Sequence, residues 1–339
     1  RNSHWLKEAI APGEEDCPSL VGDISADVCI VGGGYTGLWS AIQLKQQEPS
    51  LDVVVIEKDV CGAGASGRNG GFVLSWWAKF LSLEKICGGE EAVRLAAASA
   101  ESVDAIGEFC AEEGIDAHYK RDGWLWAATN DSQVDAWNGT AEAAARYQQY
   151  PFEKWDAEKV GARSGSTRHQ AGIFEPTAAS VQPAALARGL RQAALARGVK
   201  IFENTPMAKL TGRAKSEVTT PKGRIKAAKV ILALNAWGVQ FAPIHRAIMV
   251  ASSDIVITDA MPERLEEMGW RDGMTISDGR MLVHYYRTTR DGRIAFGKGG
   301  INGRWPYGGK IGTKLDGPTQ IADSVLSWLQ WTYPELGQV

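Results

Sequence analysis

Short runs of branched apolar residues and longer amphipathic stretches alternate in the first part of the chain. Residues 28–31 and 53–56 are uninterrupted apolar runs of strand length, and residues 38–47 carry apolar positions at helical spacing up to Pro49. Uninterrupted apolar runs are typical of strands that are buried on both faces of a parallel sheet. The two strands and the helix between them therefore predict a βαβ unit.

Apolar residues continue at helical spacing along the chain and later recur at every second position. Further helices are predicted at 90–110, 133–147 and 183–197. From residue 244 the apolar positions favour antiparallel strands, at 244–258, 281–286 and 293–296. Asp291-Gly292 predicts a hairpin turn between the last two strands. The amphipathic stretch 318–331 predicts a final helix.

These patterns predict a mixed α/β protein with two interleaved domains. The length of 339 residues exceeds one ordinary domain, and 44% apolar with 23% charged residues is a globular composition. We expect a discontinuous, Rossmann-type nucleotide-binding domain over 22–75 and 160–240. We expect an antiparallel-sheet substrate domain over 76–159 and 241–330.

Composition argues against several classes of partner and site. The chain has 37 basic and 40 acidic residues, so it lacks the positive charge that binds nucleic acid. No apolar run approaches the ~20 residues of a transmembrane helix. The five cysteines are widely spaced and the five histidines are scattered, so we expect no disulfide framework, no metal site and a cytoplasmic protein. The chain starts without Met or an apolar signal core, so we expect that it was trimmed or that its first residue is missing from this sequence.

The turn after the first predicted strand carries the pattern Gly-x-Gly-x-x-Gly, and an acid ends the second strand. Between a strand and a helix this pattern is typical of dinucleotide binding. The glycines permit a tight turn, a close approach of a pyrophosphate and packing of the helix on the strand. The helix N-terminus attracts phosphate, and the acid accepts hydrogen bonds from ribose hydroxyls. The expected contacts are Gly32, Gly34, Tyr35, Thr36, Gly37, Glu57 and Lys58.

A second glycine-rich segment, 62–71, bears on which dinucleotide is bound. The first motif alone also fits a nicotinamide cofactor, so an NAD(P)-linked dehydrogenase is an alternative at this point. The second segment exposes backbone N–H groups, and Ser66, Arg68 and Asn69 add donors for a diphosphate or a flavin. An extended FAD molecule requires such a second line of contacts, which NAD generally does not. The pair of motifs therefore favours FAD.

These motifs resemble those of the D-amino-acid oxidase superfamily of FAD-dependent oxidoreductases. The similarity lies in residues 28–37, in Glu57 and above all in the sequence Gly-Ala-Ser-Gly-Arg-Asn-Gly-Gly at 64–71. Residues 203–207, 229–237 and 285–297 extend it over most of the chain. The chain is most similar to the branch that contains glycine oxidase, sarcosine oxidase and gamma-glutamylputrescine oxidoreductase.

The resemblance implies FAD as cofactor and a place for several residues around it. The backbone of Met207 would meet the adenine, the second loop would run under the flavin, and the strands after residue 244 would form a roof. Members of the family continue well past residues 335–336, so we expect this chain to be a fragment. The further implied contacts are Gly64, Ala65, Ser66, Arg68, Asn69, Gly70, Gly71, Asn235, Ala236 and Trp237.

The resemblance also implies a reaction. A hydride would pass from the carbon beside the nitrogen of an amine or amino acid to flavin N5, giving an imine that water hydrolyses. Oxygen or another electron acceptor would reoxidise the flavin. A flavin-binding subunit without its own turnover is a further alternative.

Two residues at the end of the predicted strand 281–286 are candidates for substrate binding. Tyr286 and Arg287 would together suit a carboxylate. Neighbouring strand residues point to opposite faces, so at most one of them can face the flavin unless the strand bulges there, and family position favours Tyr286. The tryptophans are candidates either for core packing or for an aromatic wall around the substrate: Trp76, Trp77, Trp124, Trp126 and Trp305.

Overall fold

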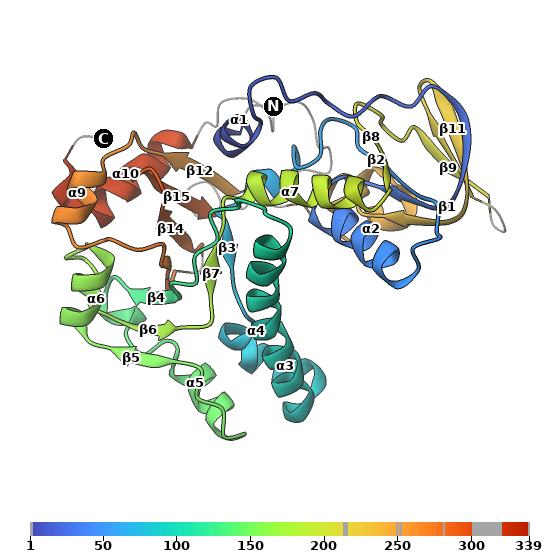
Figure 1. Cartoon of the computed structure of the whole chain (residues 1–339). Helices are drawn as coiled ribbons and strands as arrows, with labels where there is room; N and C mark the ends of the chain where they lie inside the picture. The colour runs from blue at the N-terminus through green and yellow to red at the C-terminus, as the bar shows by residue number, and fades with distance from the viewer. Residues whose placement is uncertain are drawn as a thin grey trace.

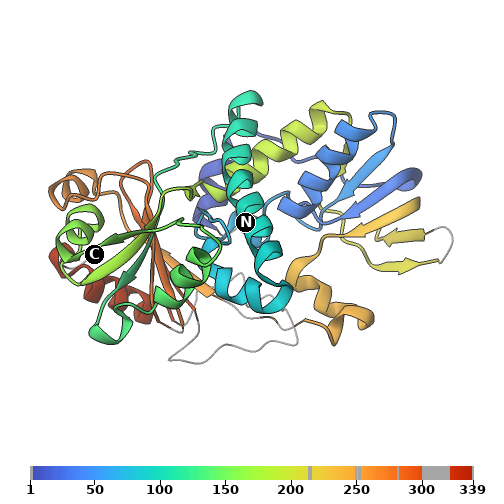
Figure 2. The same ribbon diagram turned by 90° about the horizontal axis from the view of Figure 1, so that it is seen from below.

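Two sheets, joined by helices, form the protein in the computed structural model (Figure 1). The structure describes residues 3–212, 216–248, 250, 253–280, 282–299 and 321–337. Seen from below, the two sheets lie at opposite ends of the molecule, with long helices between them (Figure 2). The prediction of a mixed α/β fold is confirmed.

The first sheet has six strands in the described chain, in the order β8-β2-β1-β11-β10-β9. Its strands are β1 (Gly22–Val31), β2 (Val53–Ile56), β8 (Lys200–Phe202), β9 (Lys209–Thr211), β10 (Ser216–Thr220) and β11 (Gly223–Leu232). The first four in spatial order run parallel, and β10 and β9 are antiparallel additions. Every residue of β2 is buried, as its uninterrupted apolar run predicts.

Helices cover one face of this sheet. α2 (Tyr35–Gln47) follows β1, and α7 (Pro183–Ala196) precedes β8. Ile30 and Val55 of the strands share a core with Leu38 of α2 and Leu190 of α7. The predicted βαβ unit β1-α2-β2 is therefore confirmed.

The second sheet has seven strands in the described chain, in the order β12-β15-β14-β13-β4-β6-β5. Its strands are β4 (Trp124–Ala128), β5 (Glu153–Trp155), β6 (Ala171–Glu175), β12 (Ser253–Ile257), β13 (Thr275–Asp278), β14 (His284–Thr288) and β15 (Ile294–Gly299). All neighbouring pairs are antiparallel except β13 and β4, which come from distant parts of the chain. The predicted domain boundary at residue 160 would divide this sheet, because β6 belongs to it.

The hairpin between β14 and β15 turns at Gly292, whose φ is +78°. The predicted strand over 244–258 is wrong in its first part, because the chain forms α8 (Ala242–His245), with a proline in the first turn. β12 then begins at Ser253. Met281 and residues 318–320, parts of the predicted strand and final helix, lie outside the described residues.

The remaining elements lie between and around the sheets. They are α1 (His4–Ala9), α3 (Phe80–Cys87), α4 (Gly89–Glu112), α5 (Asn138–Ala145), α6 (Ala157–Ser164), α9 (Pro262–Glu267), α10 (Ala322–Thr332), and the small sheet of β3 (Phe72–Val73) and β7 (Ala179–Ser180). Among the described residues, no helix is both long and apolar enough to cross a bilayer.

Candidate cofactor site

A cavity of about 340 Å³ opens beyond the carboxyl ends of β1 and β2. Its lining combines the two glycine-rich segments, Glu57 after β2 and the segment after β11. Of the residues that the sequence singles out, the cavity is lined by Gly32, Gly34, Tyr35, Thr36, Glu57, Lys58, Gly64, Ala65, Ser66, Met207, Asn235 and Trp237. Sequence reasoning missed three lining residues: Ile56, Gln240 and Phe241. The other lining residues lie in segments that carry the resemblance, and the end of the last of these segments was expected beside the FAD: Val31, Thr205, Pro206, Leu232, Ala233 and Leu234.

The first glycine turn is shaped by two close backbone contacts. A Cβ atom at Gly32 would lie 2.4 Å from the Ala233 carbonyl oxygen, and the residue has a φ of +118°. A Cβ atom at Gly37 would lie 1.9 Å from the Gly32 oxygen. Gly34 is different, since it is the N-cap of α2 with a φ of −89° and it faces the cavity. Gly34 has no side chain with which to cap the helix, so the positive end of α2 is presented to the cavity, and the amide of its first residue, Tyr35, is bonded to Ser66 Oγ.

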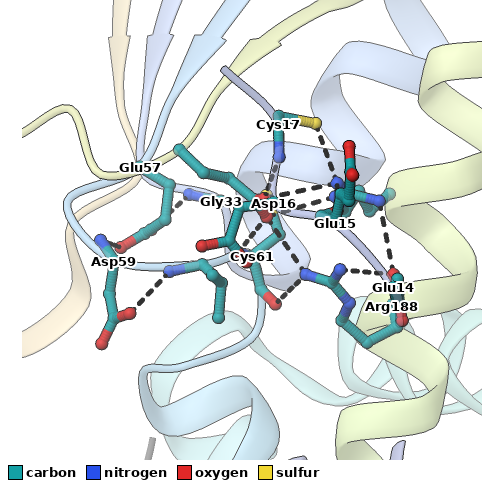
Figure 3. Close-up of polar contacts among 12 residues, drawn as sticks. Glu14, Glu15, Asp16, Cys17, Gly33, Glu57, Asp59, Cys61 and Arg188 are labelled. Atoms are coloured by element: carbon teal, nitrogen blue, oxygen red, sulfur yellow. Dashed lines mark hydrogen bonds and ion pairs between the residues drawn. The ribbon is translucent and has the colours of Figure 1, made fainter. Parts of the chain in front are cut away.

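Glu57 is fixed by the backbone at the edge of the cavity. One carboxylate oxygen accepts a hydrogen bond from the Gly33 amide (2.8 Å) and the other from the Asp59 amide (3.0 Å) (Figure 3). Burial raises the pKa of Glu57, while these two amide bonds oppose the rise. Each oxygen retains a lone pair, so the group can accept from the two hydroxyls of a ribose.

Glu57→Ala should raise the dissociation constant of FAD by roughly 10- to 150-fold, equivalent to about 1.5–3 kcal/mol. The change removes the hydrogen-bond acceptor for the ribose and releases the Gly33 amide. Fluorescence titration of the apoprotein with FAD measures the constant, and Glu57→Gln, which keeps one acceptor oxygen, should have a smaller effect. An unchanged constant for Glu57→Ala would place the ribose elsewhere.

Side chains of the second glycine-rich loop form more hydrogen bonds within the loop region than the sequence suggested. Ser66 accepts the Tyr35 amide (2.9 Å) and so links the loop to the start of α2. Arg68 donates to the Ala63 carbonyl (2.7 Å), and the Asn69 side-chain amide donates to carbonyls of the same loop. The Asn69 donors that were expected to serve the cofactor are thus bonded to carbonyls within the loop. Arg68, Asn69, Gly70, Gly71, Gly37 and Ala236 do not line the cavity.

Lys58 and Trp237, which both line the cavity, contact each other. The Lys58 ammonium lies 4.3 Å from the centroid of the Trp237 ring. Trp237 also lies over Gly64, where a Cβ atom would be 3.5 Å from its ring. A cation–π pair of this kind holds the indole over the second loop.

The expectation that Tyr286 faces the cavity is wrong. Its side chain is 1% exposed, its hydroxyl pairs with His169 Nε2 (2.6 Å), and its ring stacks on Phe296. The face of β14 that carries Tyr286 packs in the core with α10 residues such as Leu329. The pairing register of β14 therefore decides to which face the Tyr286 side chain points. The position of Tyr286 in the sequence alone does not decide it.

Tyr285 and Arg287 occupy the opposite face, toward the second loop. A Cβ atom at Gly70 would lie 3.2 Å from the Tyr285 ring, and the Tyr285 hydroxyl pairs with Ser253 Oγ (2.7 Å). The Arg287 guanidinium donates to the carbonyls of Gly70 (2.7 Å), Val181 (2.6 Å) and Thr288 (3.0 Å). Arg287 thus supports the loop with donors that were expected to hold a carboxylate. The alternation of side chains along β14 could have indicated this arrangement. Gly297 of β15 lies opposite Tyr285, and counting from that pair places Arg287 on the face of Tyr285 and Tyr286 on the other face.

The tryptophans lie in different surroundings. Trp77 is buried and stacks on Phe80. Trp126 shares a face of the second sheet with Tyr285, because both are paired with Ser277 across neighbouring strands. Trp76 is 49% exposed. Trp305 lies outside the described residues.

The family model of FAD dependent oxidoreductases (DAO) matches residues 27–339. The chain belongs to this family. It is 31% identical to the gamma-glutamylputrescine oxidoreductase of Escherichia coli K12 over 92% of this chain and 71% of that protein. The fold is similar to glycine oxidase from Geobacillus kaustophilus (TM-score 0.68, 20% identity, 93% of this chain and 80% of that one). It is also similar to L-proline dehydrogenase from P. horikoshii (TM-score 0.67, 20% identity, 94% and 79%).

FAD is the cofactor of this oxidoreductase, and the residues of the cavity fit it. The N-terminus of α2 suits the pyrophosphate, and Gly34 leaves room for it. Glu57 suits the ribose, and the volume lies within the usual range of cofactor sites, about 300–1,000 Å³. The nicotinamide alternative is thereby rejected. Within the described residues, no cluster of three or more potential metal ligands occurs.

Proposed function

We propose that this FAD-dependent oxidoreductase oxidises the C–N bond of an amine or amino acid. The observation that carries the proposal is the 31% identity to a gamma-glutamylputrescine oxidoreductase, which extends over 92% of the chain and so includes the second sheet. FAD, when bound, supplies the acceptor for the hydride that leaves the carbon beside the substrate nitrogen, and water hydrolyses the resulting imine. The contribution of the chain is to bind the substrate and to exclude water from the reacting atoms.

Large apolar side chains in and after β3 support this role. Phe72 meets the Tyr285 ring edge-on, with centroids 5.9 Å apart. Further along the chain, Leu74 is 36% and Trp76 is 49% exposed. Exposed apolar and aromatic side chains suit contact with the aliphatic chain of an amine.

The contacts of the Arg287 side chain favour an amine substrate without an α-carboxylate. Its donors bind three backbone carbonyls, and its Cζ lies 5.1 Å from the Trp5 ring centroid. A guanidinium held in this way has no free fork for a bidentate carboxylate. We therefore expect amines to outperform their α-carboxylated counterparts as substrates.

An anaerobic screen tests the function directly. Candidate amines and matched amino acids are mixed with the FAD-loaded protein, and substrate oxidation is followed as bleaching of the flavin absorbance. Bleaching by an amine, and recovery on admission of oxygen or an artificial acceptor, are expected. A flavin that dithionite reduces but no amine or amino acid bleaches would favour a flavin-binding subunit instead.

Tyr285→Leu should raise the KM for the amine by about 2- to 12-fold, because an aromatic contact contributes about 0.5–1.5 kcal/mol. Tyr286→Phe should leave KM unchanged and lower the unfolding free energy by about 0.5–1.5 kcal/mol, because it loses the hydrogen bond to His169. Steady-state kinetics and chemical denaturation measure the two effects. A KM change that follows Tyr286 instead of Tyr285 would contradict the assignment of faces.

A further inference from the structure

The N-terminal segment, residues 3–20, contacts the second glycine-rich loop. Its helix α1 packs against α7 (Figure 1). The family match begins only at residue 27, and none of residues 3–20 lines the FAD cavity. We call residues 3–20 the N-terminal strap. We propose that the strap positions the second glycine-rich loop for FAD, so that FAD affinity depends on contacts made outside the cavity; the loop is taken here with the residue that precedes it, as residues 61–71.

The first turn of α1 contacts the middle of the loop. The Ser3 hydroxyl donates to the Gly67 carbonyl at 2.7 Å. Trp5 and Leu6 are 4% and 0% exposed, and they share a small core with residues of the loop region, Val60 and Ala63. The strap thereby covers the side of the loop that faces away from the cofactor.

Trp5 also supports the end of the loop through Arg287. The Arg287 guanidinium lies 5.1 Å from the Trp5 ring centroid and donates to the Gly70 carbonyl at 2.7 Å. Burial lowers the pKa of Arg287 to about 10, so the group stays charged at neutral pH and keeps its attraction to the indole. Loss of the indole would leave a buried cation without this contact.

A buried ion network connects the strap to the start of the loop (Figure 3). Glu14 of the strap pairs with Arg188 and Arg191 of α7. Both arginines also pair with Glu203, which is 0% exposed. The two oxygens of Glu203 accept the amides of Cys17, in the strap, and Cys61, in the loop, each at 2.7 Å. One carboxylate therefore holds the strap and the loop together.

These contacts reach the loop at its start, its middle and its end: Cys61, Gly67 and Gly70. A glycine-rich segment has high conformational freedom, and a ligand that must order it loses affinity in doing so. A strap that orders the loop beforehand raises the affinity for FAD. The strap acts on FAD binding, whichever substrate is oxidised.

The test is FAD titration of apoprotein variants of the full chain, followed by fluorescence. Trp5→Ala and Glu14→Ala should each raise the dissociation constant about tenfold or more. Trp5→Phe keeps an aromatic ring and should restore most of the affinity. Glu15→Ala removes the neighbouring carboxylate, which has no hydrogen bond or ion pair to the residues that the structure describes, and should leave the constant unchanged.

Hydrogen exchange separates loop positioning from general stabilisation. In apoprotein, Trp5→Ala and Glu14→Ala should speed amide exchange in residues 61–71 while the rate in α4 stays at the wild-type value. If either variant does not fold, Ser3→Ala, which removes only the hydrogen bond to Gly67, should still weaken FAD binding and speed exchange in the loop. The proposal is overturned if folded variants bind FAD as tightly as wild type, or if Glu15→Ala weakens binding equally.

Discussion

Gly34→Leu is expected to yield a folded protein that carries no FAD. Gly34 has a φ of −89°, which any residue adopts, so the substitution does not strain the backbone. Its added Cβ would lie 2.9 Å from one side-chain oxygen, Ser66 Oγ, which can rotate away at the cost of its hydrogen bond to the Tyr35 amide. The leucine side chain would then occupy the cavity at the N-terminus of α2, where the pyrophosphate of FAD must approach the backbone.

Flavin absorbance of the purified protein and titration of its apo form measure this loss. A suitable control is Gly139→Leu on α5, where the nearest atom to an added Cβ is 3.8 Å away. The control should bind FAD like wild type. Full flavin occupancy in Gly34→Leu would mean that this turn does not hold the pyrophosphate. Gly37→Ala serves as a contrast, because its Cβ would clash with the Gly32 carbonyl and should disturb the turn itself.

The elements that sequence reasoning could predict are those specified by neighbours in the chain. The turn from β1 into α2, the strand β2 and the position of Glu57 follow from local spacing, and all of them meet at the cavity. The hairpin at Gly292 also follows from its own residues. In each case the structural cause lies within a few residues of the effect.

The parts that could not be predicted depend on distant partners. Tyr286 is buried because β14 pairs with β15 in one register and α10 covers that face. Asn69 is committed to carbonyls of its own loop, a geometry that the order of residue types does not encode. The Glu203 network joins residues from the strap, from α7 and from the end of β8, more than 170 positions apart at its extremes.

Glu203→Ala is expected to cause the largest loss of stability, about 3–5 kcal/mol in unfolding free energy. The carboxylate is fully buried and accepts two backbone amides besides pairing with Arg188 and Arg191. Its removal leaves two buried guanidinium groups with less compensating charge and two amides without an acceptor. Chemical denaturation at neutral pH measures the loss. Glu91→Ala is the control, because its ion pair with Arg94 is exposed and should contribute at most about 1 kcal/mol.

The same carboxylate predicts a pH dependence. Burial by itself would raise the pKa of Glu203, but the amides of Cys61 and Cys17 and the charges of Arg191 and Arg188 outweigh it and hold the pKa below its usual value. A carboxyl group with a lowered folded-state pKa stabilises the protein above its unfolded-state pKa, and this stabilisation disappears as the pH falls through the folded-state value. Wild-type protein should therefore lose this contribution on acidification below about pH 4.3, the usual glutamate value, whereas Glu203→Ala should show a flatter profile. Parallel acid profiles for the two proteins would show that Glu203 does not hold this network in its charged form.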